Sequence, residues 1–237
     1  MPGGDVLVAL NAVTKDYRAL RPLRLQRLEL RAGESIALLG VDAPMSEVLV
    51  NLITGAQLPD SGEVTVFGRA TSAVTGVDDW VSDLDRFGLV SERAVLVDQF
   101  TAAQNLALPL TLEIDEIPPD VATAVHNLAV EVGLSADELS ALTGALSAAA
   151  QLRLRLGRAL ALTPRILIAE HPNARLSQGE AAAFAADFAR ITAERKLGSL
   201  VMTADATFAG AIADQVLTLQ PATGELKARS GWRRWLS

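Results

Sequence analysis

Residues 35–47 read SIALLGVDAPMSE, and this segment carries the first indication of fold class. Ser35 to Leu39 is a largely apolar run, which is typical of a strand buried on both faces of a parallel sheet. Gly40 ends the run and permits a tight turn. Val48 to Ile53 then has the composition of a helix, closed by Gly55. A buried strand, a glycine turn and a helix in this order indicate an α/β domain.

The same alternation continues along the chain. Further buried strands are expected at 165–169, 199–203 and 215–219, the last of these being the final strand. Helices are expected over 121–132, 147–162, 180–195 and 208–213. Short strands are expected at 6–10, 25–30 and 63–67, of which 25–30 mixes apolar and polar residues as on an edge sheet, and residues 71–142 should be mostly helical. These elements predict a mainly parallel sheet covered on both faces by helices.

Composition narrows the class of protein. The chain has 237 residues, of which half are hydrophobic and 21% charged, as in a globular domain. Its net charge is −7, so it lacks the excess of basic residues that is typical of a nucleic-acid binder. It has no cysteine, which excludes disulfides and thiolate metal sites and fits a reducing cytoplasm. There is no signal-peptide pattern and no apolar run of the roughly 20 residues that cross a bilayer, so a soluble protein is expected.

Several short motifs occur in a recognisable order. They are Tyr17, the turn 32–34, the hairpin 59–64, the segment 105–110 and the helix end 157–164. Together they resemble the nucleotide-binding domain of ABC transporters over about 8–219, and the segment 105–110 looks like the lipoprotein-release and macrolide-export subfamily. The resemblance implies a P-loop NTPase-like α/β fold with an antiparallel N-terminal β part. It also implies one domain over 1–237, with a core at about 8–90 and 160–220 and a helical subdomain at about 91–158.

The phosphate loop departs from the family pattern G-x-x-x-x-G-K-[ST], in which backbone amides cradle phosphates, lysine reaches the β/γ oxygens and the hydroxyl binds Mg²⁺. Gly40 keeps the first glycine. Met45 stands for the second glycine, Ser46 for the lysine and Glu47 for the metal-binding hydroxyl. Asp42 adds a second carboxylate. The loop has therefore exchanged its cation for acidic side chains, and firm triphosphate binding is not expected.

The contact loops of the family are altered too. Glu92 stands at the glutamine-loop position. The signature L-S-G-G-Q reads LSAAA, with Ser147, Ala148 and Ala149 at the positions that would contact the γ-phosphate of a partner subunit. Each added methyl group crowds a close backbone approach. Both composite sites of a family dimer would be damaged.

The hydrolytic positions are replaced as well. Glu170 stands for the aspartate that supports Mg²⁺, His171 for the glutamate base and Ala204 for the switch histidine. Loss of a positioned base typically costs about 10²–10⁴ in rate, and none of the replacements is expected to compensate for another. The resemblance therefore implies no catalytic residue, no metal and no required cofactor, with weak binding of ATP and Mg²⁺ as the alternative.

Each of these residues also has a purely structural interpretation. Tyr17 is either the aromatic that stacks on adenine or a packed surface residue, and Gly40 is needed for a tight turn whether or not phosphate binds. Asp42 could cap the helix that follows, and Glu47 could be a favourable charge near its N-terminus. Three arginines of the signature helix are expected to form a solvated or interfacial face: Arg153, Arg155 and Arg158. The basic, aromatic tail 231–235 is either a contact for lipid headgroups or a disordered end.

Three functional hypotheses follow. The favoured one is a non-hydrolysing subunit that pairs with a second nucleotide-binding subunit and docks on a membrane permease from the cytoplasmic side, with peripheral membrane attachment. The second is a diverged but active ATPase with His171 as its base, since histidine titrates near neutrality. The third is a stand-alone scaffold that kept the fold. The sequence names neither a transported substrate nor a partner nor an oligomeric state.

Overall fold

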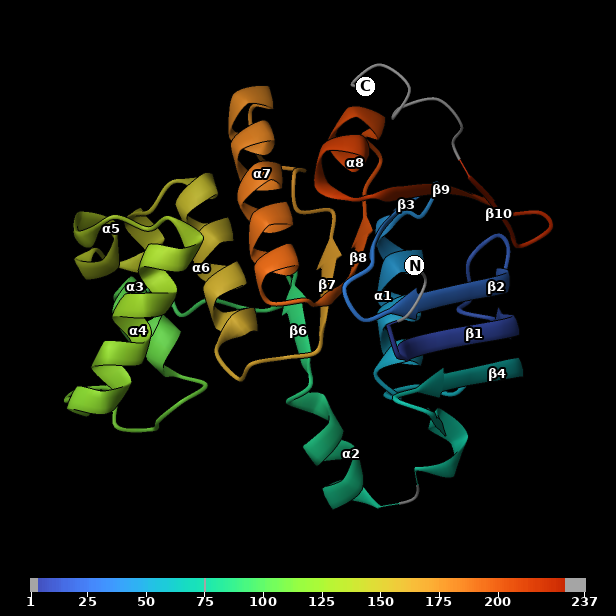
Figure 1. Ribbon diagram of the computed structural model, residues 1–237, viewed down its shortest axis with the longest axis horizontal. Helices are drawn as coiled ribbons and strands as arrows, with labels where there is room; N and C mark the ends of the chain where they lie inside the picture. The colour runs from blue at the N-terminus through green and yellow to red at the C-terminus, as the bar shows by residue number, and fades with distance from the viewer. Residues whose placement is uncertain (1–3, 75, 229–237) are drawn as a thin grey trace.

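The protein is seen in a computed structural model that describes residues 4–74 and 76–228, and a six-stranded sheet runs through its centre (Figure 1). In order across the sheet the strands are β10 (Glu225–Ala228), β9 (Gln215–Gln220), β3 (Ser35–Leu39), β8 (Gly198–Met202), β7 (Ile166–Glu170) and β6 (Phe87–Val90). All neighbours are parallel except the β9–β10 pair. The mainly parallel sheet is therefore confirmed.

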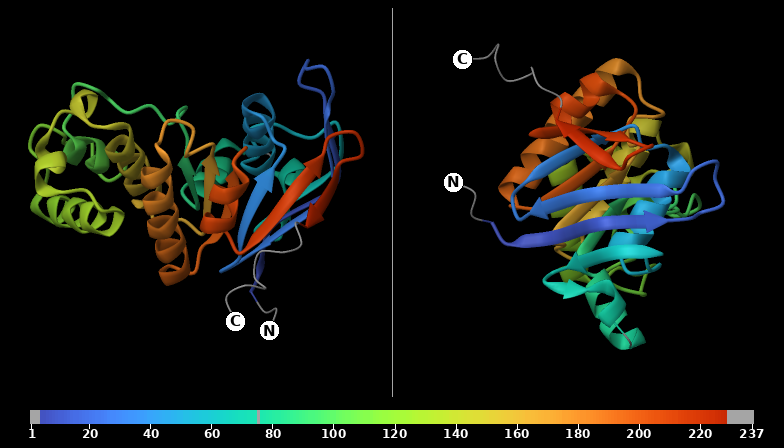
Figure 2. Two further views of the ribbon diagram at one scale, coloured as in Figure 1. Left: turned by 90° about the horizontal axis from the view of Figure 1, so that it is seen from above. Right: turned by 90° about the vertical axis from the view of Figure 1, so that its right-hand side faces the viewer.

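A second, antiparallel sheet is built from the N-terminal part of the chain. Its strands, in order, are β2 (Leu23–Arg31), β1 (Val6–Lys15), β4 (Ser61–Val66) and the short β5 (Arg69–Ala70). Figure 2 shows this sheet at one end of the molecule and most of the helices at the other. The antiparallel N-terminal part is confirmed, with strands longer than the sequence suggests.

The helices surround the central sheet and extend from it on one side (Figure 1). They are α1 (Ala43–Ile53), α2 (Val77–Leu84), α3 (Ala102–Ala107), α4 (Pro119–Val132), α5 (Ala136–Ser140), α6 (Ala148–Leu160), α7 (Gln178–Glu194) and α8 (Ala206–Ile212). α4 ends at Gly133, whose φ of 76° is the left-handed cap that glycine adopts without strain. None of the helices in the described residues is long and apolar enough to cross a membrane.

Two hydrophobic cores use opposite faces of the central sheet. In β3, Ala37 and Leu39 belong to the core formed with helices α3, α4, α6, α7 and α8. Ile36 and Leu38 belong to the core formed with α1 and the antiparallel sheet. Successive side chains of a strand point to opposite faces, so a strand between two cores must be apolar at every position. This is why the central strands read as unbroken apolar runs.

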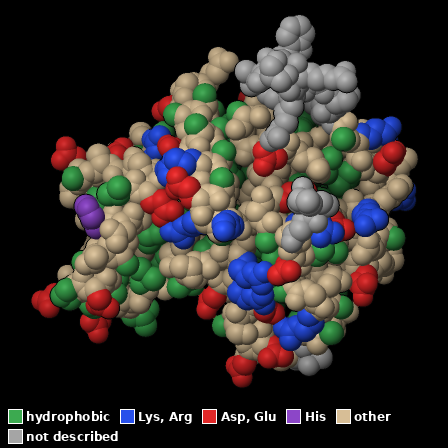
Figure 3. Space-filling model, viewed as in Figure 1, with side chains coloured by type: hydrophobic (Ala, Val, Ile, Leu, Met, Phe, Trp, Pro, Cys, Tyr) green, Lys and Arg blue, Asp and Glu red, His purple; other side chains and the backbone are tan. Residues whose placement is uncertain are grey.

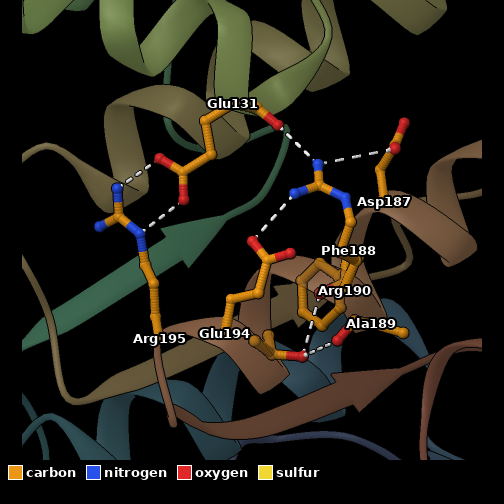
Figure 4. A network of polar contacts seen from close by, with 8 residues as sticks. Glu131, Asp187, Phe188, Ala189, Arg190, Glu194 and Arg195 are labelled. Carbon is orange, nitrogen blue, oxygen red and sulfur yellow. Dashed lines mark hydrogen bonds and ion pairs between the residues drawn. The ribbon is translucent and has the colours of Figure 1, made fainter.

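A polar network fastens α4 to the C-terminal end of α7 (Figure 4). The Arg195 guanidinium binds both carboxylate oxygens of Glu131, with Nε donating at 2.7 Å. Arg190 donates to the main-chain carbonyl of Glu131 at 2.9 Å and forms an ion pair with Glu194 at 3.0 Å. Bidentate arginine–carboxylate contacts have fixed geometry. They therefore fix α4 relative to the C-terminal end of α7.

Two strands of the central sheet were not predicted from the sequence. β6 lies inside the part expected to be mostly helical, and β10 follows the strand expected to be the last. β6 has only four residues, one of them Gly88, and it is held by pairing with β7, which is remote in the chain. β10 is exposed at three of its four residues and is held by pairing with β9. Neither strand has a local pattern strong enough to identify it, because tertiary pairing stabilises both.

We predict that Gly88→Ala destabilises the protein. A Cβ at this position would lie 2.5 Å from the Ala159 carbonyl oxygen of α6 and 2.8 Å from Leu167 of β7. Forcing a methyl group into such a contact costs about 1–3 kcal/mol, measured as the free energy of unfolding in urea. Gly179→Ala in α7 is the control, because no atom lies within 4 Å of its Cβ position. It should leave stability unchanged or raise it by about 0.5–1 kcal/mol. Equal stability of the two variants would contradict close packing of β6 on α6.

Candidate functional site

The sequence-predicted site residues gather where the parallel strands end. Leu38 of β3 pairs with Met202 of β8, which pairs in turn with Glu170 of β7. The main-chain amide of Thr203 donates to the Leu38 carbonyl at 3.1 Å, and that of His171 donates to the Met202 carbonyl at 2.8 Å. The carboxyl edge of a parallel sheet is where α/β proteins bind ligands. The ends of β3, β7 and β8 thus define the candidate site.

The segment after β3 forms a helix where the family pattern has an open loop. α1 begins at Ala43, earlier than the Val48 start expected from the sequence. Asp42 caps it, because its carboxylate accepts from the Met45 amide at 2.9 Å. The Asp42 carbonyl accepts from the Ser46 amide at 2.8 Å. An aspartate N-cap followed by Pro44 in the first turn is a favourable helix start, which explains the early boundary.

The amides of this segment are therefore satisfied within the protein. Those of Met45 and Ser46 both have acceptors on Asp42, and the Ser46 hydroxyl donates to the Ala43 carbonyl at 2.8 Å. Ser46 is only 2% exposed, so it offers no group to a ligand at the surface. The expected cap by Asp42 is present, and it takes the donors that a phosphate would need.

Gly40 has a conformational role in the turn. Its φ is +79°, a region that glycine adopts readily and other residues rarely do. A Cβ there would lie 3.0 Å from the Leu219 carbonyl oxygen of β9. These two constraints account for the glycine without a phosphate.

A cation stands between two of the acidic site residues. The Arg93 guanidinium makes a two-bond contact with Glu170, with Nη2 at 2.7 Å and Nε at 3.1 Å from the two carboxylate oxygens. Its Nη1 lies 3.4 Å from the Glu47 carboxylate. The expectation that Glu47 is a favourable charge near the helix N-terminus is therefore wrong. Because α1 starts at Ala43, Glu47 lies beyond the first turn and faces Arg93 instead.

Arg93 is the site residue that sequence reasoning missed. It lies in the loop after β6, a strand that was not predicted, so nothing placed it at the carboxyl edge. The sequence signal that could have identified it is the adjacent charge pair Glu92-Arg93, which with Ser91 directly follows an apolar run. Its hydrogen bonds with Glu170 raise the pKa of the guanidinium above its ordinary value, against the effect of partial burial. The pairing therefore stabilises the charged form of Arg93.

The neighbouring residue Glu92 faces α6. Its carboxylate accepts from Arg155 at 3.1 Å and lies 3.5 Å from the Arg175 guanidinium. Arg155 was expected on a solvated or interfacial face, but only 8% of it is exposed. Burial lowers the pKa of Arg155, and the nearby Arg175 charge acts in the same direction. Glu92 partly offsets that cost, which explains a carboxylate at the glutamine-loop position.

The remaining hydrolytic positions hold no charged partner. His171 adopts a φ of 45°, and its Nε2 is buried without a hydrogen-bond partner among the described residues. Ala204 is exposed, and the neighbouring Asp205 caps α8 by accepting from the Thr207 and Phe208 amides. In the described part of the chain, His171 thus has a buried imidazole nitrogen without a partner, and Ala204 has no polar side chain.

The signature-like residues form the start of α6. The Ser147 hydroxyl accepts from the Ala150 amide at 3.2 Å and so caps this helix. Ala148 and Ala149 occupy its first turn and are partly exposed. Among the described residues, no hydrogen bond or ion pair joins this turn to 40–47.

Tyr17 lies close to the start of α1. It is half-buried and packs against the core formed with the antiparallel sheet. The pKa of its phenol is raised, first by burial and second by the negative charge of Asp42. The ring is therefore packed and near the site, which is compatible with both interpretations given for it.

The residues at this edge do not fit a magnesium nucleotide. The two carboxylates at the metal positions are paired with Arg93, and no cluster of three or more metal-ligating side chains occurs in the described residues. The amides of Met45 and Ser46 are bonded internally. Basic and acidic side chains are interspersed over the face in Figure 3, without a broad region of one sign. We find no cation free to hold a triphosphate among the site residues described above.

A surface pocket of about 220 Å³ opens beside the loop after β6. It is lined by Phe87, Leu89, Ala94, Pro109, Arg155, Arg158, Ala159 and Leu162. Burial and the neighbouring Arg155 charge lower the pKa of Arg158, which donates to the Val95 carbonyl at 2.7 Å. The Nε of Arg155 is buried and has no hydrogen-bond partner within 4–74 and 76–228. The pocket combines apolar walls with two guanidinium groups and suits a carboxylate on an apolar segment.

Comparison with known proteins identifies the family. The sequence profile of the ABC transporter family matches residues 23–174. The chain is 29% identical to the lipoprotein-releasing system ATP-binding protein LolD of Gluconobacter oxydans, covering 92% of this chain and 94% of that protein. It is 29% identical to the Fe(3+) ions import ATP-binding protein FbpC of Serratia marcescens, over 89% of this chain but only 59% of that protein. The dimeric bacterial ABC transporter cassette MJ0796 has the same fold, with a TM-score of 0.78, 21% identity and coverage of 95% of this chain and all of that one.

We predict that Tyr17, the only tyrosine of the chain, ionises above pH 10. Its contribution to stability should be present below about pH 10, the ordinary value for a phenol. It should be lost as the pH rises through the raised pKa, because the folded state favours the neutral form. Absorbance at 295 nm measures the phenolate directly.

Asp42→Asn tests the cause, because asparagine keeps the helix cap and removes the charge. The phenol pKa should fall in this variant but stay above its ordinary value, since burial is the larger cause. An unchanged titration would show that Asp42 does not act on Tyr17.

Proposed function

Because the chain belongs to the ABC transporter family, we propose that it is a non-hydrolysing ATP-binding-cassette subunit, a pseudo-ATPase that serves as a structural or regulatory partner in an ABC-transporter-type complex. One observation carries the proposal. α1 begins at Ala43, and Asp42 takes the amide hydrogens that would otherwise face a phosphate. A fold with this helix start retains its shape and loses its phosphate cradle.

Magnitudes support the same conclusion. A charge-assisted hydrogen bond contributes roughly 1.5–3 kcal/mol, so having Ser46 in place of the lysine weakens a micromolar site by about 10- to 100-fold. The Arg93 guanidinium does not replace that lysine, because it already binds Glu170 and lies beside Glu47. A triphosphate would have to displace two carboxylates to reach it. We therefore expect neither firm ATP binding nor a bound magnesium ion.

The alternative of an active ATPase has one observation in its favour. The Nε2 of His171 is buried and has no hydrogen-bond partner in the described part of the chain. A general base that accepts a proton from a water molecule needs such an unoccupied nitrogen. This alternative requires ATP turnover that is lost in His171→Ala and Glu170→Ala. It lacks a cation to stabilise the transferred phosphoryl group, on which phosphoryl transfer depends. We favour the non-hydrolysing role for this reason.

We propose that the subunit works with two kinds of partner on the cytoplasmic face of a membrane, as a peripheral component. The first is a second nucleotide-binding subunit, as homodimer or heterodimer, since the similar cassette MJ0796 is dimeric. The second is a membrane permease, for which residues 91–158 would act as a helical subdomain. A stand-alone scaffold is the remaining alternative, and it requires that no permease co-purifies.

The pocket beside β6 is our proposed permease contact. Its two guanidinium groups, from Arg155 and Arg158, fit an acidic side chain, and the exposed Val95 and Leu162 nearby fit apolar residues beside that acid. Arg158 already donates to a carbonyl, so it is positioned without help from a ligand.

We predict that Arg158→Glu releases the permease from the complex when both proteins are co-expressed and purified from detergent-solubilised membranes. The introduced carboxylate would repel the acidic side chain, and the substitution breaks no ion pair among the described residues, because Arg158 has no carboxylate partner there. Arg27→Glu on β2 is the control, since Arg27 is exposed and remote from the pocket. Equal permease recovery with both variants would exclude the pocket as the contact.

We predict that calorimetric titration with Mg-ATP detects no binding tighter than about 10 μM, because the phosphate donors are occupied within the protein. The LolD protein of Gluconobacter oxydans, titrated in parallel, is the positive control. A dissociation constant below about 10 μM for this chain would overturn the proposed function.

A further inference from the structure

Two consecutive residues connect the candidate site to α6. Glu92 and Arg93 follow β6, and their side chains bind groups on opposite sides. Arg93 contacts Glu47 and Glu170, the two residues at positions that the family resemblance assigns to magnesium. Both positions hold carboxylates, and the same guanidinium serves both. A cation of the chain itself therefore lies where a metal ion would be expected.

Burial makes this contact obligatory. The Glu170 side chain is 6% exposed, while Arg93 is 38% exposed and covers it. A buried carboxylate without a partner is strongly unfavourable. Arg93 supplies two hydrogen bonds to it in the planar geometry that suits a carboxylate. The direction of the Arg93 pKa, raised chiefly by Glu170, supports a tight pair.

Glu92 makes the matching contact on the other side. It accepts from the buried Arg155 of α6 and lies beside Arg175, which follows β7. The whole cluster contains three carboxylates and three guanidinium groups: Glu47, Glu92, Glu170, Arg93, Arg155 and Arg175. The formal charges of these six side chains sum to zero.

We propose that Glu92 and Arg93 form a latch that holds the loop after β6 between α6 and the carboxyl edge of the sheet, with the Arg93 guanidinium in place of a divalent cation. The latch rests on the proposed function in one respect, namely that no nucleotide-bound metal competes with Arg93. It adds a structural consequence to the proposed function, because the loop then connects α6 to β7 whether or not a nucleotide is present. The position of α6 would not depend on a nucleotide.

Arg93→Met tests the latch in the full chain without nucleotide. We expect its Tm to fall by about 5–15 °C, since an unpaired buried charge is left behind. We also expect faster amide hydrogen exchange in residues 91–101. Arg69→Met is the matched control, because Arg69 also forms ion pairs, with Asp79 and Asp83, but at an exposed site. A Tm and an exchange rate equal to those of the control would overturn the proposal.

Two further measurements separate charge from packing. In a Glu170→Gln background, Arg93→Met should lower the Tm far less than in the wild-type chain. If Arg93→Met alone does not fold, this double variant can still be compared with Glu170→Gln. Millimolar Mn²⁺ should raise the Tm of Arg93→Met, whose two carboxylates are free, and not that of the wild-type chain. If Arg93→Met lowers the Tm equally in both backgrounds, or if Mn²⁺ does not raise the Tm of Arg93→Met, the Arg93 guanidinium does not stand in place of a divalent cation.

Failure of the latch and failure of the proposed function are distinguishable. The latch is measured without nucleotide, on variants of Arg93. The proposed function is measured on the wild-type chain, by titration with Mg-ATP. The Arg93→Met variant could lose stability as expected while the wild-type chain binds Mg-ATP tightly. That combination would support the latch and contradict only the non-hydrolysing role.

Discussion

The charge of Glu170 has to be balanced inside the protein. This carboxylate ends the central strand β7, and almost all of its surface is buried. Arg93 meets the requirement with two hydrogen bonds, and its third nitrogen faces Glu47 of α1. One side chain therefore connects three elements that are far apart in the sequence. The shape of the carboxyl edge depends on this pairing.

The start of α1 is the second determinant of the site. Asp42 caps the helix and Pro44 fits its first turn, so the helix begins directly after the turn at Gly40. In a phosphate-binding loop the corresponding amides stay open to a ligand. Here a side chain of the protein itself satisfies them. The helix N-terminus is stabilised by aspartate in the way that a phosphate could have stabilised it.

Fold and chemistry are separable in this chain. The two cores on either side of the central sheet are built from apolar side chains such as Leu38 and Leu167, and none of the replaced hydrolytic residues belongs to either core. A family fold can therefore persist after the residues that bind and hydrolyse nucleotide have been replaced. Membership of a family establishes the architecture, and the site has to be argued from its own residues.

The chain's apolar runs were sufficient to predict the parallel sheet, because a strand between two cores must be apolar at every position. The same local patterns placed the main helices and identified Asp42 as a cap. They could not place β6, β10 or Arg93, nor reveal that Arg155 is buried, since each depends on contacts between segments distant in sequence. The residues next to a charge pair in a loop do not indicate which distant side chains it will bind. Only the packing of β6 beside β7 brings Arg93 to Glu170, because hydrogen bonds between strands act across space and leave little trace in the order of residues.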